Sequence, residues 1–112
     1  MKDIITVAVV NFRVDAADKA SNLSRMCGFT EAAAKRGADL ILFPEMCLYG
    51  YDYYVDESVP QEEKVKVSET INGASCQAIA EITKKYGIYA VFGMAEKTED
   101  TPDADLYNSA VA

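Results

Sequence analysis

The sequence contains no histidine. Catalysis by a Ser-His-Asp or Cys-His group within this chain is therefore excluded, and the commonest metal ligand is missing. The acidic stretch at residues 52–63 also lacks the ligand spacing and the glycine of a calcium loop. The sequence thus predicts no metal site.

Cysteine is scarce as well. Cys27, Cys47 and Cys76 are widely spaced, odd in number and form no CxxC pair. This is not the pattern of a disulfide scaffold, so we expect free thiols in a reduced, cytoplasmic protein. No apolar run approaches the length of a transmembrane helix, and the N-terminus lacks a signal-peptide cleavage site, so we expect no membrane partner.

Positive charge is in the minority, since the net charge of the 112 residues is -7. Residues 52–63 hold five acidic and no basic residues, and residues 96–105 hold five acidic residues against one lysine. We interpret both stretches as solvated loops. An acidic chain without clustered lysine and arginine is not expected to bind nucleic acid.

The apolar pattern alternates between buried strands and amphipathic helices within one domain, residues 1–112. Asp15, with Asp18 as a weak capping-box partner, is the expected start of the first helix, and Gly37 and Gly87 are the expected helix ends. Residues 46–67 are expected to form a loop that could hold a turn of helix. The predicted strands are 4–11, 39–43, 88–94 and 106–112, and the predicted helices are 16–36 and 74–86.

This β-α-β-α-β-β order predicts an α/β fold with a parallel sheet. No glycine-rich phosphate loop follows the first strand, so a nucleotide-binding version is not supported. Gly28 lies within the first helix, where glycine costs roughly 1 kcal/mol relative to alanine, and it could admit a second backbone closely. The last residues are an apolar strand, which predicts that the domain continues beyond Ala112.

Glu45 is the first candidate for chemistry. It follows Pro44 at the end of the second strand, and ligands of parallel α/β sheets bind beyond the carboxyl ends of the strands. A carboxylate at such a rim is expected to be partly desolvated, which suits proton transfer. The alternative is structural, because Pro followed by Glu also commonly begins a helix.

An ordered set of motifs favours the catalytic interpretation of Glu45 over the structural one. It runs from residue 4 to residue 112 and resembles the nitrilase superfamily of carbon–nitrogen hydrolases. The motifs are Val7-Ala8-Val9-Val10, Asn22-Leu23, Gly37-Ala38-Asp39-Leu40-Ile41-Leu42-Phe43-Pro44-Glu45, Gly50-Tyr51, Gly93-Met94-Ala95-Glu96 and Leu106-Tyr107-Asn108-Ser109-Ala110-Val111.

The resemblance implies an αββα sandwich, usually dimerised through helices, of which this chain is the N-terminal part. It implies a Glu-Lys-Cys mechanism without a cofactor, in which a thiolate attacks the carbon of an amide or nitrile. Glu45 matches the glutamate, which takes the thiol proton and later activates water. The lysine and the cysteine would both follow Ala112, so the chain alone is expected to be inactive. Amides are favoured over nitriles, because amidases outnumber nitrilases among such relatives.

The remaining candidates have structural explanations. Cys27 and Cys76 fall on apolar helix stripes, and Cys47 does not match the family nucleophile, so we interpret all three as packing residues, with Cys47 also a possible pocket wall. Asn108 is expected to make a structural hydrogen bond inside the sandwich and not a catalytic one. Tyr51 is expected to line the substrate pocket, and the tyrosine cluster is expected to pack the loop or a dimer contact. The cluster comprises Tyr49, Tyr51, Tyr53 and Tyr54.

Two other functions are open to this sequence. The chain could be an interaction module that pairs through its open sheet with a second copy or with a complementary chain. It could also be a small regulatory domain, but the acidic trio and lysine of a phospho-receiver are not evident. The expected partners are therefore a small amide or nitrile in an intact enzyme, and a second copy or a complementary C-terminal segment.

Overall fold

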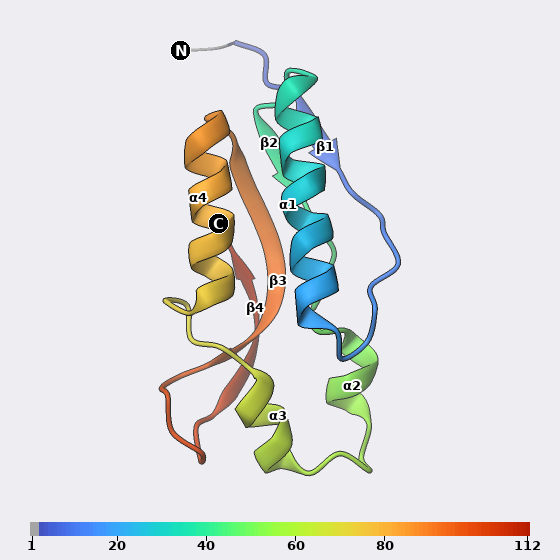
Figure 1. The fold of residues 1–112 in the computed structure, drawn as a ribbon, viewed down its shortest axis with the longest axis vertical. Coiled ribbons are helices and arrows are strands. Elements are labelled where there is room, and N and C mark those ends of the chain that lie inside the picture. The colour runs from blue at the N-terminus through green and yellow to red at the C-terminus, as the bar shows by residue number, and fades with distance from the viewer. Residues whose placement is uncertain (1–2) are drawn as a thin grey trace.

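The computed structural model describes residues 3–112 as helices packed on a mixed sheet (Figure 1). The strands are β1 (Val7–Val9), β2 (Leu40–Leu42), β3 (Tyr89–Lys97) and β4 (Leu106–Val111). The helices are α1 (Lys19–Lys35), α2 (Tyr51–Val55), α3 (Gln61–Val67) and α4 (Ala74–Tyr86). The predicted α/β class and the order of the long elements are confirmed.

The four strands form one sheet in the order β1-β2-β3-β4. The first three are parallel, with Ala8 beside Ile41 and Ile41 beside Ala90, whereas β3 and β4 pair in antiparallel fashion. Each parallel step is a β-α-β unit, which explains why α1 and α4 lie on the same side of the sheet (Figure 1). The strands β1 and β2 end side by side, whereas β3 continues from Val91, opposite Leu42, to Lys97.

The core lies between the sheet and the α1–α4 pair. Met26 of α1, Ile41 of β2 and Met94 of β3 are almost completely buried there. The apolar stripe that contains Cys27 is only partly the buried one. Its Thr30 belongs to the innermost row of α1, whereas Leu23 and Cys27 lie at the edge of the core. That row consists of Asn22, Met26, Thr30 and Ala33.

The opposite face of the sheet carries apolar side chains that the described helices leave exposed. Val9 of β1 is 75% exposed and Tyr89 of β3 is 78% exposed. Parallel strands normally have both faces covered, so this face has the composition of a contact surface.

The expected helices need two corrections. Residues 46–67, expected as a loop with room for a turn of helix, hold two short helices, α2 and α3, which are too short for an apolar period to be visible. Helix α3 is instead favoured by its charges, because acidic residues lie in its first turn and lysines in its last. Helix α1 is capped by Asp18, whose carboxylate accepts a hydrogen bond from the Ser21 N–H (3.1 Å), and not by Asp15.

The helix ends agree better with the sequence. Gly87 has φ 64° at the end of α4, and Gly37 has φ 88° just after α1, as the expected stops require. No helix among residues 3–112 has the length and apolar character needed to cross a bilayer.

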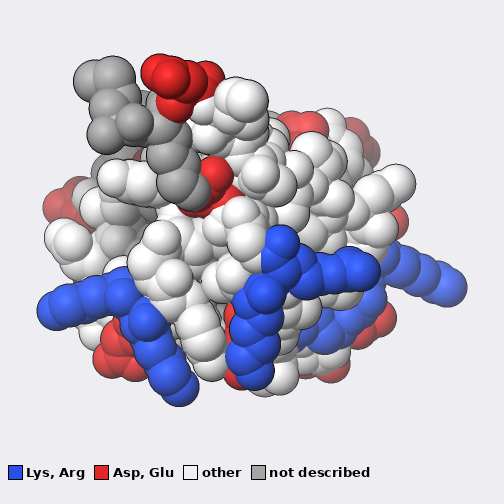
Figure 2. Space-filling view, turned by 90° about the horizontal axis from the view of Figure 1, so that it is seen from above, with Lys and Arg blue, Asp and Glu red and all other residues white. Residues whose placement is uncertain are grey.

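Lysine and arginine side chains gather at one end of the molecule (Figure 2), and the two acidic stretches lie at the other. Figure 2 looks onto the end where α1 and α4 finish, and lysine and arginine side chains project from it. Lys35, Lys84 and Lys85 occupy the last turns of these helices, where cations interact favourably with the helix dipole. The two acidic stretches lie at the other end, around α2, α3 and the β3–β4 connection (Figure 1).

Gly28 offers a direct test of the helix packing. A β-carbon at this exposed position of α1 would meet nothing within 4 Å, so the expected close approach of another backbone is wrong. Gly28→Ala is expected to raise the free energy of unfolding by about 0.5–1 kcal/mol, because alanine loses less backbone entropy on folding. Urea denaturation followed by circular dichroism measures the change, and an unchanged or lower midpoint would contradict it.

Candidate active site

Glu45 lies just beyond the carboxyl end of β2, beside Gly93 in the middle of β3. Residues 45–49 form turns and α2 begins at Tyr51, so Pro44-Glu45 does not begin a helix. The Glu45 side chain is exposed, and the expected desolvation is not found within the described chain. The position of this carboxylate at the end of β2 was therefore predicted correctly, but its burial was overestimated.

The backbone of Glu45 is held against β3 by a glycine. A β-carbon at Gly93 would lie 2.5 Å from the Met46 nitrogen and 2.8 Å from the Glu45 Cα. The Cys47 N–H also donates to the Gly93 carbonyl (3.1 Å). Met46 adopts φ 51°, a conformation that costs a side-chain-bearing residue about 1–2 kcal/mol. These contacts fix where Glu45 leaves the sheet.

Asn22 holds the same turn from the helix side. It is fully buried, and its Nδ2 donates to the carbonyls of Asp15 (2.8 Å) and Leu48 (3.1 Å). Its Oδ1 accepts from the Asp15 N–H at 2.8 Å. One amide therefore joins the segment before α1 to the turn after β2. Asn22 and Gly93 stand in the quoted motifs, but their roles were not predicted; a glycine inside a strand is the signal that indicates such a close approach.

Asn108 reaches the Glu45 carboxylate directly. It lies on β4 opposite Ala95 of β3, and its Nδ2 donates a hydrogen bond to Glu45 Oε1. The expected structural hydrogen bond within the sandwich is therefore a bond to the candidate acid–base residue. Two residues 63 positions apart in sequence meet because the turn after β2 crosses over Gly93 toward β4.

A hollow of about 320 Å³ adjoins this pair. Met46 and Asn108 line it together with Tyr51, and its one charged lining residue is Lys64 of α3. Tyr51 is 53% exposed at the start of α2, so it stands beside the neighbours of Glu45 as a pocket residue would. The other lining residues are Tyr54, Gln61, Ala95, Leu106 and Tyr107.

Cys47 is a packing residue. Its side chain is completely buried, with Sγ 3.6 Å from the Gly93 carbonyl oxygen and 3.7 Å from Met26 Sδ. Burial raises the pKa of the Cys47 thiol to about 11, so the thiol is protonated at neutral pH and is a poor nucleophile. Cys27 and Cys76 are free thiols that pack at the edge of the core, as their helix stripes predicted.

The tyrosine cluster packs the loop, as expected, but Tyr51 stands outside it. The rings of Tyr49 and Tyr53 lie 4.7 Å apart, and those of Tyr53 and Tyr54 lie 5.4 Å apart, both edge to face. The Tyr54 and Ser68 hydroxyls are 2.8 Å apart, and burial raises the pKa of Tyr54 to about 12. This cluster therefore secures α2 against the end of α3.

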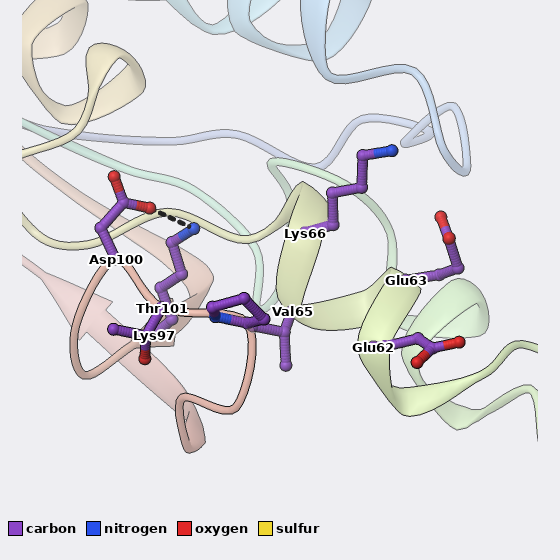
Figure 3. Close-up of a pocket in the computed structure, with 8 residues that line it drawn as sticks. Glu62, Glu63, Val65, Lys66, Lys97, Asp100 and Thr101 are labelled. Atoms are coloured by element: carbon purple, nitrogen blue, oxygen red, sulfur yellow. Dashed lines mark ion pairs between the residues drawn. The ribbon is translucent and has the colours of Figure 1, made fainter.

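A second hollow, of about 420 Å³, lies between α3 and the β3–β4 connection (Figure 3). Lys97 Nζ pairs with Asp100 Oδ1 at 2.8 Å, while Glu62 and Glu63 point away from that ion pair. Glu45 does not line this hollow, and its charges already pair with each other or face solvent. Among residues 3–112, no group of three histidine, cysteine or acidic side chains could hold a metal ion.

A carboxylate at the carboxyl end of a central parallel strand, beside an open hollow, defines an α/β protein with a rim site. The sequence model of the carbon-nitrogen hydrolase family matches residues 6–112. The chain belongs to this family.

Individual relatives agree with this assignment. The chain is 29% identical over 109 residues to a nitrilase of Pyrococcus abyssi, covering 96% of this chain and 38% of that protein. It is 34% identical over 94 residues to omega-amidase NIT2 of Mus musculus, covering 81% of this chain and 29% of the relative. The chain thus spans less than two-fifths of the length of these curated relatives.

Solved structures share the fold. The NitN amidase from Neterenkonia sp. AN1 superposes with a TM-score of 0.68 at 21% identity, covering 96% of this chain and 37% of the amidase. Glutamine-dependent NAD+ synthetase from Acinetobacter baumannii superposes with a TM-score of 0.65 at 31% identity, covering 95% of this chain and 18% of the synthetase. The four-stranded sheet and its helices therefore match part of a nitrilase-type structure.

Proposed function

We propose that residues 1–112 form the N-terminal part of a carbon–nitrogen hydrolase domain and supply the glutamate of its Glu-Lys-Cys mechanism. Glu45 would take the proton of a cysteine thiol, so that the thiolate attacks the carbon of an amide or nitrile, and would later activate water. The lysine and the cysteine would come from residues outside this chain. Alone, the chain would bind part of a substrate and catalyse nothing.

The placement of Glu45 carries this proposal. Its backbone is fixed against Gly93, and its carboxylate remains exposed beside the hollow that Tyr51 lines. A general base needs both properties, since it must be positioned and must be reachable by the group that gives up the proton. Tyr51 would contact the substrate from the start of α2.

The relatives support a small amide or nitrile as the substrate. One similar protein is a nitrilase and another is an omega-amidase. A glutamate-to-glutamine mutant of an amidase from Nesterenkonia sp. AN1, similar in fold, shows the result of Michael addition of acrylamide at its active-site cysteine. Non-peptide amides are accordingly the first substrates to assay, and nitriles the second.

One observation favours a second role in assembly. Val9 and Tyr89 expose apolar surface on the sheet face away from α1 and α4. We propose that this face pairs with a second copy or with a complementary C-terminal segment, because an exposed apolar surface on a parallel sheet is unfavourable in water. In a purely non-catalytic module, pairing would be the whole function.

The 112-residue chain alone is expected to release no ammonia from simple amides such as butyramide and to be larger than a monomer in solution. The buried, protonated Cys47 cannot replace the missing nucleophile. Ammonia release and molar mass by light scattering are the measurements. Turnover that disappears in Cys47→Ala would contradict our interpretation of that thiol, and a stable monomer would contradict pairing through the open sheet.

A further inference from the structure

We infer that Asn108 is a positioning residue that holds the Glu45 carboxylate in its working orientation by donating a hydrogen bond from Nδ2 to Oε1. This inference rests on the proposed function of Glu45 as the acid–base residue. It extends that function to a side chain on a different strand.

The backbone contacts fix the position of Glu45 but not the orientation of its carboxylate, and the Asn108 amide sets that orientation. Gly93 and Cys47 fix the main chain of the turn, but the exposed Glu45 side chain can still rotate about several bonds. Asn108 is the single hydrogen-bond partner found for this carboxylate among residues 3–112. Without it, the direction of the carboxylate would be set by solvent.

The geometry of the β3–β4 pair brings Asn108 to the correct place. Gly93 lies opposite Ala110, and Ala95 lies opposite Asn108, so these four residues share one face of the strand pair. Gly93 and Ala95 are small, and the turn carrying Glu45 crosses over Gly93 on that face. The Asn108 side chain therefore meets Glu45 across β3 without passing a bulky residue.

The chemistry of an amide also suits a base. Asn108 donates without carrying charge, so it orients the carboxylate without neutralising it as a lysine would. The bond engages Oε1 and leaves Oε2 free to accept a proton. Because an amide does not titrate, the orientation persists over the whole working pH range.

The test uses the polypeptide that carries this chain together with the family's lysine and cysteine. Asn108→Leu, which keeps the size but removes the donor, is expected to lower kcat by about 10- to 100-fold with little change in KM, because a misplaced catalytic group loses turnover. Ser109→Ala is the matched control. It removes a hydrogen bond of the same strand, from Ser109 Oγ to Glu96 Oε1 (2.8 Å), that does not involve Glu45. Both variants should keep the parent's thermal unfolding midpoint.

Asn108→Asp provides a readout that a merely structural role would not change. An aspartate at position 108 would place a second carboxylate beside Glu45. Two adjacent carboxylates repel each other when both are ionised, so the acid limb of the pH–rate profile should move to higher pH. Glu45→Gln/Asn108→Leu should be no slower than Glu45→Gln alone, because Asn108 acts through Glu45. If Asn108→Leu fails to fold, the pH profile of Asn108→Asp still decides the question.

A second measurement is independent of turnover. The side-chain amide signals of Asn108 in the ¹⁵N spectrum of the chain should shift as acid is added, and Glu45→Gln should abolish that shift. Any of three results would overturn the inference: normal turnover in Asn108→Leu, an acid limb in Asn108→Asp at the same pH as in the parent, or Asn108 amide signals that shift with acid equally in Glu45→Gln. An active Glu45→Gln variant would instead overturn the proposed function itself.

Discussion

Glu45→Gln is expected to reduce turnover by roughly 10²- to 10⁴-fold in the polypeptide that carries the family's lysine and cysteine, while leaving the fold intact. Glutamine has nearly the same size as glutamate and can still occupy the exposed position after β2, but it cannot accept the thiol proton or activate water. The loss should fall on kcat, with KM for the amide changed little. Ammonia release at substrate saturation measures it.

Glu99→Gln is the matched control for this result. Glu99 is also an exposed glutamate, but it lies in the β3–β4 connection, away from the turn after β2. Its neutralisation should leave kcat within about twofold, because a surface charge remote from the reacting atoms contributes little. Near-normal amide hydrolysis by Glu45→Gln, with an unchanged unfolding midpoint, would show that Glu45 is structural.

Gly93→Ala is expected to destabilise the protein by about 1–3 kcal/mol and to lower turnover by about 10²-fold. The added β-carbon would lie 2.5 Å from the Met46 nitrogen and 3.0 Å from the Glu45 carbonyl carbon. Both are backbone atoms, so no side chain can rotate away, and the turn itself must move. The carboxylate would then be displaced from Asn108. Urea denaturation measures the stability, and ammonia release measures the activity.

Gly28→Ala separates this local effect from the general effect of replacing glycine. A β-carbon at Gly28 meets nothing within 4 Å, so stability should rise in that variant and fall in Gly93→Ala. A gain of stability in Gly28→Ala together with a loss in Gly93→Ala would show that Gly93 acts through its contact with the Glu45 turn. A Gly93→Ala protein with parental stability and turnover would contradict the close approach.

The long elements were predictable because each is encoded by its own local pattern. Continuous apolar runs indicated parallel strands, although Val7 and Val9 of β1 are exposed in this chain, and Gly37 and Gly87 correctly marked the ends of α1 and α4. The sequence indicated at most one turn of helix where α2 and α3 lie, since five and seven residues are too few to display a helical period. Asp15 was the expected cap of α1, with Asp18 only as its capping-box partner, but it is Asp18 that accepts the hydrogen bond from the Ser21 N–H and caps the helix.

The sequence by itself determined the α/β class, the family and the position of Glu45 at a strand end, because these depend on residues near one another along the chain. The partners of Glu45 were decided by tertiary structure alone. Gly93 lies under its backbone and Asn108 bonds its carboxylate, yet both come from later strands that only sheet order and register bring alongside. Burial of Cys47 and exposure of Glu45 likewise depend on which face of the sheet the helices cover, and a linear pattern of residues does not specify that packing.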